Sequence, residues 1–125
     1  MYKLIISDDE DVIREGLAGL VNWKELGYEL VACLRDGSEV IDYIENNPAD
    51  VLFTDIKMST VSGMDLARYV FENRPEIKVV ILSGYKEFDY ARKAIDYGVE
   101  SYLLKPTRFN EVVSTFAGVR QKLDM

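Results

Sequence analysis

The sequence predicts an α/β fold in which a five-stranded parallel sheet carries helices on both faces. Two observations predict it. Short apolar runs alternate five times with longer stretches whose apolar residues recur at helical spacing, and because parallel strands need crossover connections, this order calls for a parallel sheet. The runs are also rich in Val, Ile and Leu instead of alternating with polar residues, which is typical of strands buried on both faces.

In the first half of the chain the elements are bounded by clear signals. We expect strands at Tyr2–Ser7, Tyr28–Leu34 and Val51–Thr54, and helices at Asp11–Asn22 and Ser38–Asn46. The second helix ends at Asn46, Asn47 and Pro48. The first helix is predicted to bury one apolar face, made of Val12, Ile13, Leu17, Leu20 and Val21.

The second half continues the same order. A helix over Met64–Glu72 follows Gly63 and stops before Pro75, and Lys78–Leu82 is the fourth strand. We expect a fourth helix over Glu87–Tyr97, with Gly98 as its C-cap. A short strand at Ser101–Leu104 precedes a last helix at Asn110–Leu123, whose apolar face contains Val112, Val113, Phe116, Val119 and Leu123.

Composition limits the classes of function. The 125 residues predict a single domain over 1–125, and the formal net charge of −7 disfavours direct contact with nucleic acid. The chain has no histidine, so histidine metal sites and catalytic triads are excluded. Its one cysteine, Cys33, lies in an apolar run and is expected to be a buried structural thiol. No signal peptide or membrane span is visible, which predicts a cytoplasmic protein without membrane contact.

Polar residues directly follow four of the predicted strands. The first strand is followed by Asp8, Asp9 and Glu10, and the third by Asp55. The fourth is followed by Ser83-Gly84, and the fifth by Lys105-Pro106. In a doubly wound sheet these carboxyl ends meet at one edge. Grouped carboxylates favour a hard divalent cation such as Mg²⁺. A free carboxylate beside that ion could attack phosphorus, with Lys105 and the Ser83 hydroxyl binding phosphate oxygens.

Each of these residues also has a simpler interpretation. Asp8, Asp9 and Glu10 could be a helix start, where acidic side chains cap the backbone and interact with the dipole. Asp55 could cap the loop that follows it, Ser83-Gly84 could be a turn, and Lys105 could be a solvated surface lysine. Their joint position at strand ends, with complementary chemical types, favours the site.

At this point the sequence resembles the receiver domain of two-component response regulators over its whole length. The resemblance rests on four segments in order: SDDE at 7–10, FTDIKM at 53–58, ILSGY at 81–85 and YLLKP at 102–106. It implies a flavodoxin-like (βα)5 doubly wound sandwich with strand order 2-1-3-4-5. It also implies a phosphoacceptor signalling domain, not an enzyme, which assists only its own phosphorylation and dephosphorylation.

The resemblance implies a role for each site residue. Asp55 is the phosphate acceptor, which receives phosphate from a sensor histidine kinase. Mg²⁺ is bound by Asp8, Asp9, Asp55 and the backbone carbonyl of Lys57. Ser83 is the switch hydroxyl, Tyr102 is the switch aromatic, and Lys105 pairs with the phosphate. The Lys105-Pro106 bond is expected to be cis.

A finer resemblance is to receivers of AraC-type (YesN-like) transcriptional regulators. It rests on IREGLAGLVNW, on WKELG at 23–27 and on the segment with Gly84, Tyr85, Phe88, Tyr90 and Ala91. It implies a C-terminal helix-turn-helix domain outside this chain. Two interpretations of the aromatic residues stay open: a homodimer through the face of the fourth and fifth helices, or ordinary surface and packing of the fourth helix against the sheet. One departure is Ser59, where many receivers have proline; we expect a more mobile loop at 59–62.

Two other functions compete with a transcriptional regulator. A stand-alone receiver would share the chemistry and act by docking on another protein. A Mg²⁺-dependent phosphohydrolase with an aspartyl nucleophile usually has a second Asp two residues after the first, where this chain has Lys57. The sequence also lacks a cap insertion that would select a substrate.

Overall fold

The computed structural model describes residues 1–84 and 94–125. Its strands are β1 (Tyr2–Ser7), β2 (Tyr28–Leu34), β3 (Val51–Asp55), β4 (Lys78–Ser83) and β5 (Ser101–Leu104); its helices are α1 (Asp11–Leu20), α2 (Gly37–Asn46), α3 (Gly63–Asn73) and α5 (Phe109–Asp124). These bounds confirm the predicted elements to within two residues. Most of the helix predicted at Glu87–Tyr97 lies outside the described residues, although the backbone at its end is helical at 94–96.

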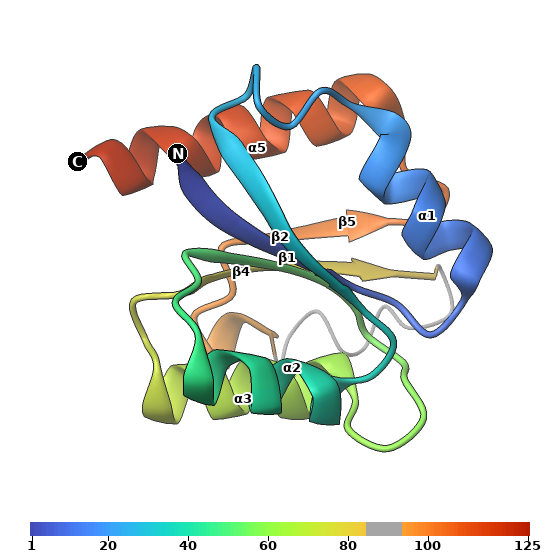
Figure 1. Ribbon diagram of the computed structural model, residues 1–125, viewed down its shortest axis with the longest axis vertical. Helices are drawn as coiled ribbons and strands as arrows, with labels where there is room; N and C mark the ends of the chain where they lie inside the picture. Colours follow the sequence, from blue (N-terminus) through green and yellow to red (C-terminus); the bar gives the residue numbers. More distant parts are fainter. Residues whose placement is uncertain (85–93) are drawn as a thin grey trace.

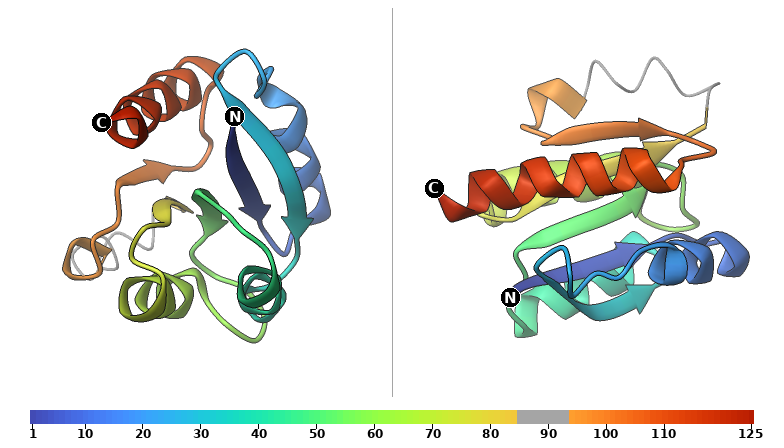
Figure 2. Two further views of the ribbon diagram at one scale, coloured as in Figure 1. Left: turned by 60° about the vertical axis from the view of Figure 1, so that its left-hand side comes forward. Right: turned by 90° about the horizontal axis from the view of Figure 1, so that it is seen from above.

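The strands form one parallel sheet in the order β2-β1-β3-β4-β5. Helices α2 and α3 cover one face of the sheet, and α1 and α5 cover the other (Figure 1). The carboxyl ends of the strands all point to the same edge, while the N-terminus and the end of α5 lie at the opposite edge (Figure 2). The predicted fold and strand order are therefore confirmed.

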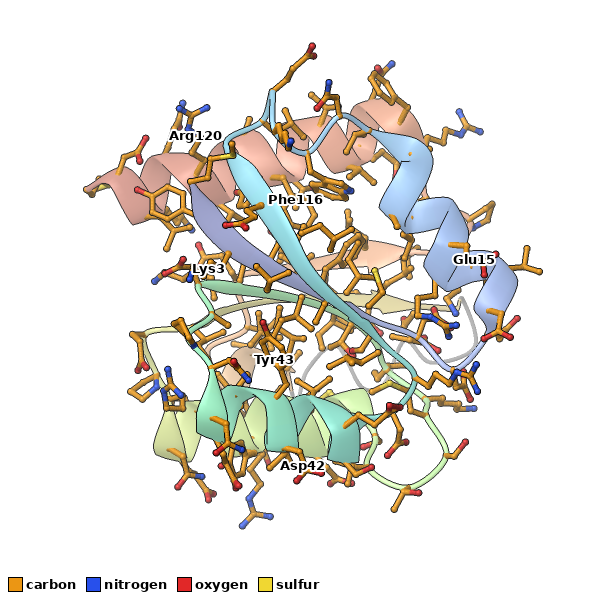
Figure 3. The ribbon with its side chains drawn as sticks, viewed as in Figure 1. Lys3, Glu15, Asp42, Tyr43, Phe116 and Arg120 are labelled. Atoms are coloured by element: carbon orange, nitrogen blue, oxygen red, sulfur yellow. The ribbon has the colours of Figure 1, made fainter. Side chains whose placement is uncertain are left out.

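Two apolar cores result from the period of two along each strand. On β1, Ile5 joins the core under α2 and α3, whereas Leu4 and Ile6 join the core under α1 and α5. Phe116 points from α5 into the second core (Figure 3). Its ring centroid lies 5.0 Å from those of Trp23 and Phe53 and 5.5 Å from that of Tyr28. The central strands β1, β3 and β4 are buried on both faces, as the sequence predicted, whereas the edge strands β2 and β5 are only partly buried.

Two burial predictions were wrong. Cys33 is exposed, because β2 is an edge strand and is only partly covered. On α1, Val12 is 82% exposed while Arg14 is only 8% exposed. The other four residues of the predicted spacing do meet the core, since Leu17 and Val21 are buried and Ile13 and Leu20 pack partly buried against it. The helix therefore leaves Val12 exposed and buries the Arg14 side chain in addition to this apolar face.

Gly98 confirms its predicted role as a C-cap. Its φ of 64° is in the left-handed region, which favours glycine. The amides of Gly98 and Val99 donate to the carbonyls of Ile95 and Ala94, as in a helix end.

Among the helices of residues 1–84 and 94–125, none has the length and apolar character that a membrane-spanning helix needs.

Candidate functional site

The carboxyl edge of the sheet brings the predicted acidic residues together. One carboxylate oxygen from each of Asp8, Asp9 and Asp55 lies within 4.8 Å of the other two. Asp8 is fully buried at the end of β1, Asp55 is 5% exposed at the end of β3, and Asp9 is exposed. Asp8 and Asp55 come together because β1 and β3, the strands at whose ends they lie, are paired side by side in the sheet. The strand-end argument therefore predicted this cluster correctly.

Lys105 supplies the cation at this cluster. Its Nζ lies 3.1 Å from Asp55 Oδ1 and 3.5 Å from Asp8 Oδ2, with the side chain 22% exposed. The backbone holds it there, because the Lys105 amide donates to the carbonyl of Ser83 at 2.7 Å. The Lys105-Pro106 peptide bond is cis, as expected. One ammonium thus faces two buried carboxylates.

The surplus of negative charge appears in the pKa values. Burial, and next the charge of Asp8, raise the pKa of Asp55 to about 6, although Lys105 opposes the shift. Burial also raises the pKa of Asp8, helped by the charges of Asp9 and Glu10. Burial opposes the charged form of Lys105, but the two carboxylates outweigh it and raise the pKa of the ammonium. An additional cation would relieve this repulsion.

The donor set fits a hard divalent cation. Asp8 Oδ2 is buried and has no hydrogen-bond partner among the described residues; its nearest cation is the Lys105 ammonium. Asp8 and Asp55 each have one oxygen fixed by a backbone amide, because Glu10 N donates to Asp8 Oδ1 and Ile56 N donates to Asp55 Oδ1, each at 2.9 Å. Oxygen ligands of this kind, held on rigid strand ends, suit Mg²⁺.

The helix-cap interpretation of the acidic run has little support. The N-cap residue of α1 is Glu10, and its side chain makes no capping hydrogen bond. The Asp8 carboxylate instead accepts a hydrogen bond from the amide of Glu10, two residues further along the chain, at 2.9 Å. These contacts aim Asp8 toward the cluster with Asp55.

Ser83 and Tyr102 meet beside the cluster. The Ser83 Oγ and the Tyr102 hydroxyl are 2.5 Å apart, and Ser83 Oγ also lies 3.3 Å from the Gly84 carbonyl. Ser83 is fully buried at the end of β4, and Tyr102 lies on the neighbouring strand β5. Lys57 has an exposed side chain on the loop after β3, and the role of its carbonyl stays a prediction.

Several supporting residues were missed at the level of sequence. Arg14 donates to the Asp8 carbonyl at 2.9 Å and to the Asp11 carboxylate at 2.5 Å, so it connects the backbone after β1 to the first turn of α1. Thr54 accepts a hydrogen bond from Ser7 at 2.6 Å and donates to the Asp55 carbonyl at 3.0 Å. An arginine three residues after an aspartate is a recognisable helix pair, but its bond to the Asp8 backbone is tertiary and leaves no sequence signal.

Comparisons with known proteins agree with this geometry. Residues 4–117 match the family model described as response regulator receiver domain. The chain is 35% identical over 123 residues to YesN, an uncharacterized transcriptional regulatory protein of Bacillus subtilis, and the match covers 98% of this chain and 33% of YesN. The chain thus spans about a third of that relative's length.

Two solved structures are similar over nearly the whole chain. The REC domain of AraT, a response regulator from Geobacillus stearothermophilus, has a TM-score of 0.93 and 38% identity, covering 98% of this chain and 95% of that one. A two component transcriptional regulator AraC from Clostridium phytofermentans has a TM-score of 0.89 and 28% identity, with the same coverage of both chains. The fold, the acidic edge and the sequence thus agree.

Proposed function

The chain belongs to the response regulator receiver domain family, and we propose that Asp55 is its phosphate acceptor in a Mg²⁺-dependent transfer. The observation that carries the proposal is the buried pair of Asp55 and Asp8 with the Lys105 ammonium 3.1 and 3.5 Å away. These two buried carboxylates share the Lys105 ammonium at the carboxyl edge of the sheet. A bound divalent cation would neutralise their excess negative charge and allow Asp55 to react with a phosphoryl group.

Asp8, Asp9, Asp55 and the backbone carbonyl of Lys57 would hold the Mg²⁺. When bound, the ion neutralises negative charge on the carboxylates and on the phosphoryl oxygens. A carboxylate oxygen of Asp55 attacks phosphorus in line and forms an acyl phosphate, and the bond from phosphorus to the donor nitrogen breaks with its electron pair going to the donor. Lys105 then pairs with the new phosphate, whose charge replaces that of the carboxylate it faced.

Incubation with acetyl phosphate and Mg²⁺, followed by intact mass spectrometry, tests this function. The protein should gain the mass of one phosphate, and a chelator should prevent the gain. Peptide mapping of the modified protein, after reduction with borohydride to trap the acyl phosphate, should place the label on Asp55. A reduced carboxyl at another position, or a phosphate that survives borohydride as an ester on Ser83, would contradict the proposal.

Ser83 and Tyr102 are proposed to report the phosphate to the surface. The Ser83 hydroxyl would donate to a phosphoryl oxygen, and where it donates to the Tyr102 hydroxyl it must first release that bond. The two packings, with Ser83 bound to Tyr102 or to phosphate, form the two states of a population shift. The remodelled surface would be the face made by the fourth helix, β5 and α5; most of the range predicted for that fourth helix lies outside the described residues.

Replacing Tyr102 by phenylalanine should tighten the binding of a phosphoryl mimic. The change removes the hydroxyl that holds Ser83 in the unphosphorylated state, so the mimic no longer competes with it. A hydrogen bond of this kind contributes about 1 kcal/mol, so the affinity for beryllium fluoride with Mg²⁺ should rise several-fold.

An NMR titration measures this affinity directly. The matched control is Tyr69→Phe, because that tyrosine hydroxyl also bonds a side chain, Glu45, but lies on α3 away from the site. The control should bind the mimic like the wild type. Weaker binding in Tyr102→Phe would show that the hydroxyl supports the phosphorylated state instead of competing with it.

The partners follow from the same family membership. We propose that a sensor histidine kinase donates the phosphate and docks near α1 and the loop after β5. An apolar groove of about 490 Å³ opens there, lined by Ile13, Gly16, Leu17, Leu20, Leu82, Lys105, Pro106 and Thr107. Its border with Lys105 would place a docked histidine beside the acceptor.

In the full-length protein we propose that an AraC-type helix-turn-helix domain follows this receiver and is controlled by it, with a homodimer as the active form. The support is the resemblance to YesN, of which the chain spans about a third, and to the AraC regulator of Clostridium phytofermentans. The receiver itself would not touch DNA, in line with its net charge of −7. The length of the native open reading frame tests this against a stand-alone receiver that acts by docking. A cytoplasmic location stays a prediction.

A further inference from the structure

A second buried carboxylate, Asp36, lies outside the acidic cluster and connects two loops. It is 8% exposed and is the N-cap residue of α2, where its Oδ2 accepts hydrogen bonds from the Ser38 amide at 3.0 Å and the Ser38 hydroxyl at 2.7 Å. Its Oδ1 accepts the Thr60 amide at 2.8 Å and, more weakly, the Val61 amide at 3.3 Å. A helix cap needs only the first set of bonds. The second set fastens the loop between β3 and α3.

That loop carries Lys57, and its ends are fixed independently of Asp36. At its start, the Ile56 amide donates to the Leu82 carbonyl at 3.0 Å; at its end, the Gly63 amide donates to the Ile56 carbonyl at 2.7 Å. Gly63 packs so closely that a Cβ there would lie 2.1 Å from the Asp55 carbonyl oxygen. Between these points no proline stiffens the chain, since the prolines are at 48, 75 and 106.

Asp36 therefore divides the loop. With Ile56 held by β4 and Thr60 held by Asp36, only residues 57–59 lie between two fixed points. Within this span the structure also gives a contact between the Thr54 hydroxyl and Met58 Sδ, at 3.9 Å. A hydrogen bond to sulfur at that distance is weak. Asp36 thus fixes the backbone three residues after Lys57 and so restricts where the Lys57 carbonyl can lie.

Gly37 lets the two loops approach. Its amide donates to the Val61 carbonyl at 3.2 Å, and a Cβ at this position would lie 2.5 Å from that carbonyl oxygen and 2.7 Å from Val61 Cγ1. A side chain there would push residues 60–61 away from Asp36. Asp36 and Gly37 therefore act on the same stretch of the loop, one by attraction and one by leaving room.

We propose that Asp36 is a positioning residue for the metal site: its carboxylate holds the loop after β3, and through that loop the Lys57 carbonyl that is proposed as a ligand together with Asp8 and Asp55. The proposal rests on the proposed function, because it assigns Asp36 a task toward the ion that the acidic cluster would hold. It also gives a loop that has Ser59 in place of proline an anchor in Asp36. Residues that orient metal ligands in this way typically change metal affinity by about 10- to 100-fold when replaced.

The charge state of Asp36 supports the geometry. Burial opposes its ionised form, but hydrogen bonds from Thr60, Ser38 and Val61 outweigh burial and lower the pKa of Asp36 to about 2. The carboxylate thus stays ionised at every pH at which the domain works, and the loop keeps its anchor.

Two NMR measurements on the whole domain test the proposal, one without metal and one with it. In the metal-free protein, Asp36→Ala should speed hydrogen exchange of the Thr60 and Val61 amides at least about tenfold, because their acceptor is gone. In a Mg²⁺ titration the same variant should bind the ion about tenfold more weakly, while saturating Mg²⁺ restores phosphate uptake from acetyl phosphate. Gly37→Ala, which keeps the carboxylate, should weaken Mg²⁺ binding in the same direction.

Asp50→Ala is the matched control. Asp50 Oδ2 accepts the Lys3 amide at 2.8 Å, but it does so at the amino edge of the sheet, opposite the site. This variant should lose stability without any change in Mg²⁺ affinity. If Asp36→Ala fails to fold, Asp36→Asn takes its place. The asparagine oxygen can still accept the Thr60 amide, whereas its NH₂ group cannot accept the Ser38 amide. We then expect a smaller loss of Mg²⁺ affinity in the same direction.

The outcomes separate the two proposals. If the wild type binds Mg²⁺ and the Asp36 variants bind it equally tightly, the positioning role is overturned and the proposed function stands. Unchanged exchange at Thr60 and Val61 would overturn the anchoring itself. If the wild type binds no Mg²⁺, the proposed function and the role of Asp36 in it both fail.

Discussion

Asp55→Asn should abolish phosphate uptake from acetyl phosphate while leaving the fold intact. Asparagine has nearly the same shape as aspartate, but its amide is not a nucleophile toward phosphorus. The other carboxylate beside Lys105, that of Asp8, is proposed to be a metal ligand and so does not replace Asp55 as the acceptor. The Asp55 Oδ1 that accepts the Ile56 amide has a counterpart in the asparagine carbonyl, so the local backbone is preserved. Intact mass after incubation with Mg²⁺ and the donor should show no added phosphate.

The matched comparison is Asp50→Asn. Asp50 also accepts a backbone amide through its carboxylate, but at the far edge of the sheet, so this variant should take up phosphate at the wild-type rate. Uptake at an unchanged rate in Asp55→Asn would show that the acceptor lies elsewhere and would refute the assignment. Uptake that is slow but measurable, moved to Asp8 or Asp9, would instead mean that the pocket activates the donor and that Asp55 is its preferred acceptor.

The sequence predicted the central part of the fold because local and tertiary preferences agree there. Strands such as β3 carry apolar residues on both sides, and each side meets its own core, so an uninterrupted apolar run is the correct signal. The prediction failed at the margins. Cys33 lies on an edge strand, and strand order cannot be derived from an apolar run alone. On α1, Arg14 is buried because the Asp8 carbonyl needs a donor, a requirement that no periodicity expresses.

The site was predictable to the extent that it is made of strand ends. Asp8 and Asp55 end adjacent parallel strands, so their positions along the chain were enough to bring them together. The residues that support them were not predictable in this way. Asp36 lies 24 residues from Thr60 in the sequence, and the preference of aspartate for helix starts explains only its bonds to Ser38. The loop at 59–62 is fastened by that distant carboxylate and not by its own sequence.

Asp55 should also make the metal-free domain less stable as the pH rises from about 4 to about 7. Burial, and then the charge of Asp8, raise its folded-state pKa to about 6, whereas the unfolded chain titrates near the usual value of about 3.9. Below both values the carboxyl is protonated in both states and has no effect. Between them the unfolded chain releases its proton first, so the folded state loses about 3 kcal/mol of stability by neutral pH.

Asp55→Asn removes this group, so the variant should be more stable than the wild type at neutral pH, and the difference should shrink as the pH falls toward about 4. Chemical denaturation in the presence of a chelator, at a series of pH values, measures the difference directly. A saturating Mg²⁺ concentration should reverse the order at neutral pH, because the ion stabilises only the folded state and binds the wild type more tightly. A difference between the two proteins that does not change with pH would show that the buried carboxylate is not under electrostatic strain. The acceptor would then lack the charge imbalance that, in our proposal, favours its reaction with phosphate.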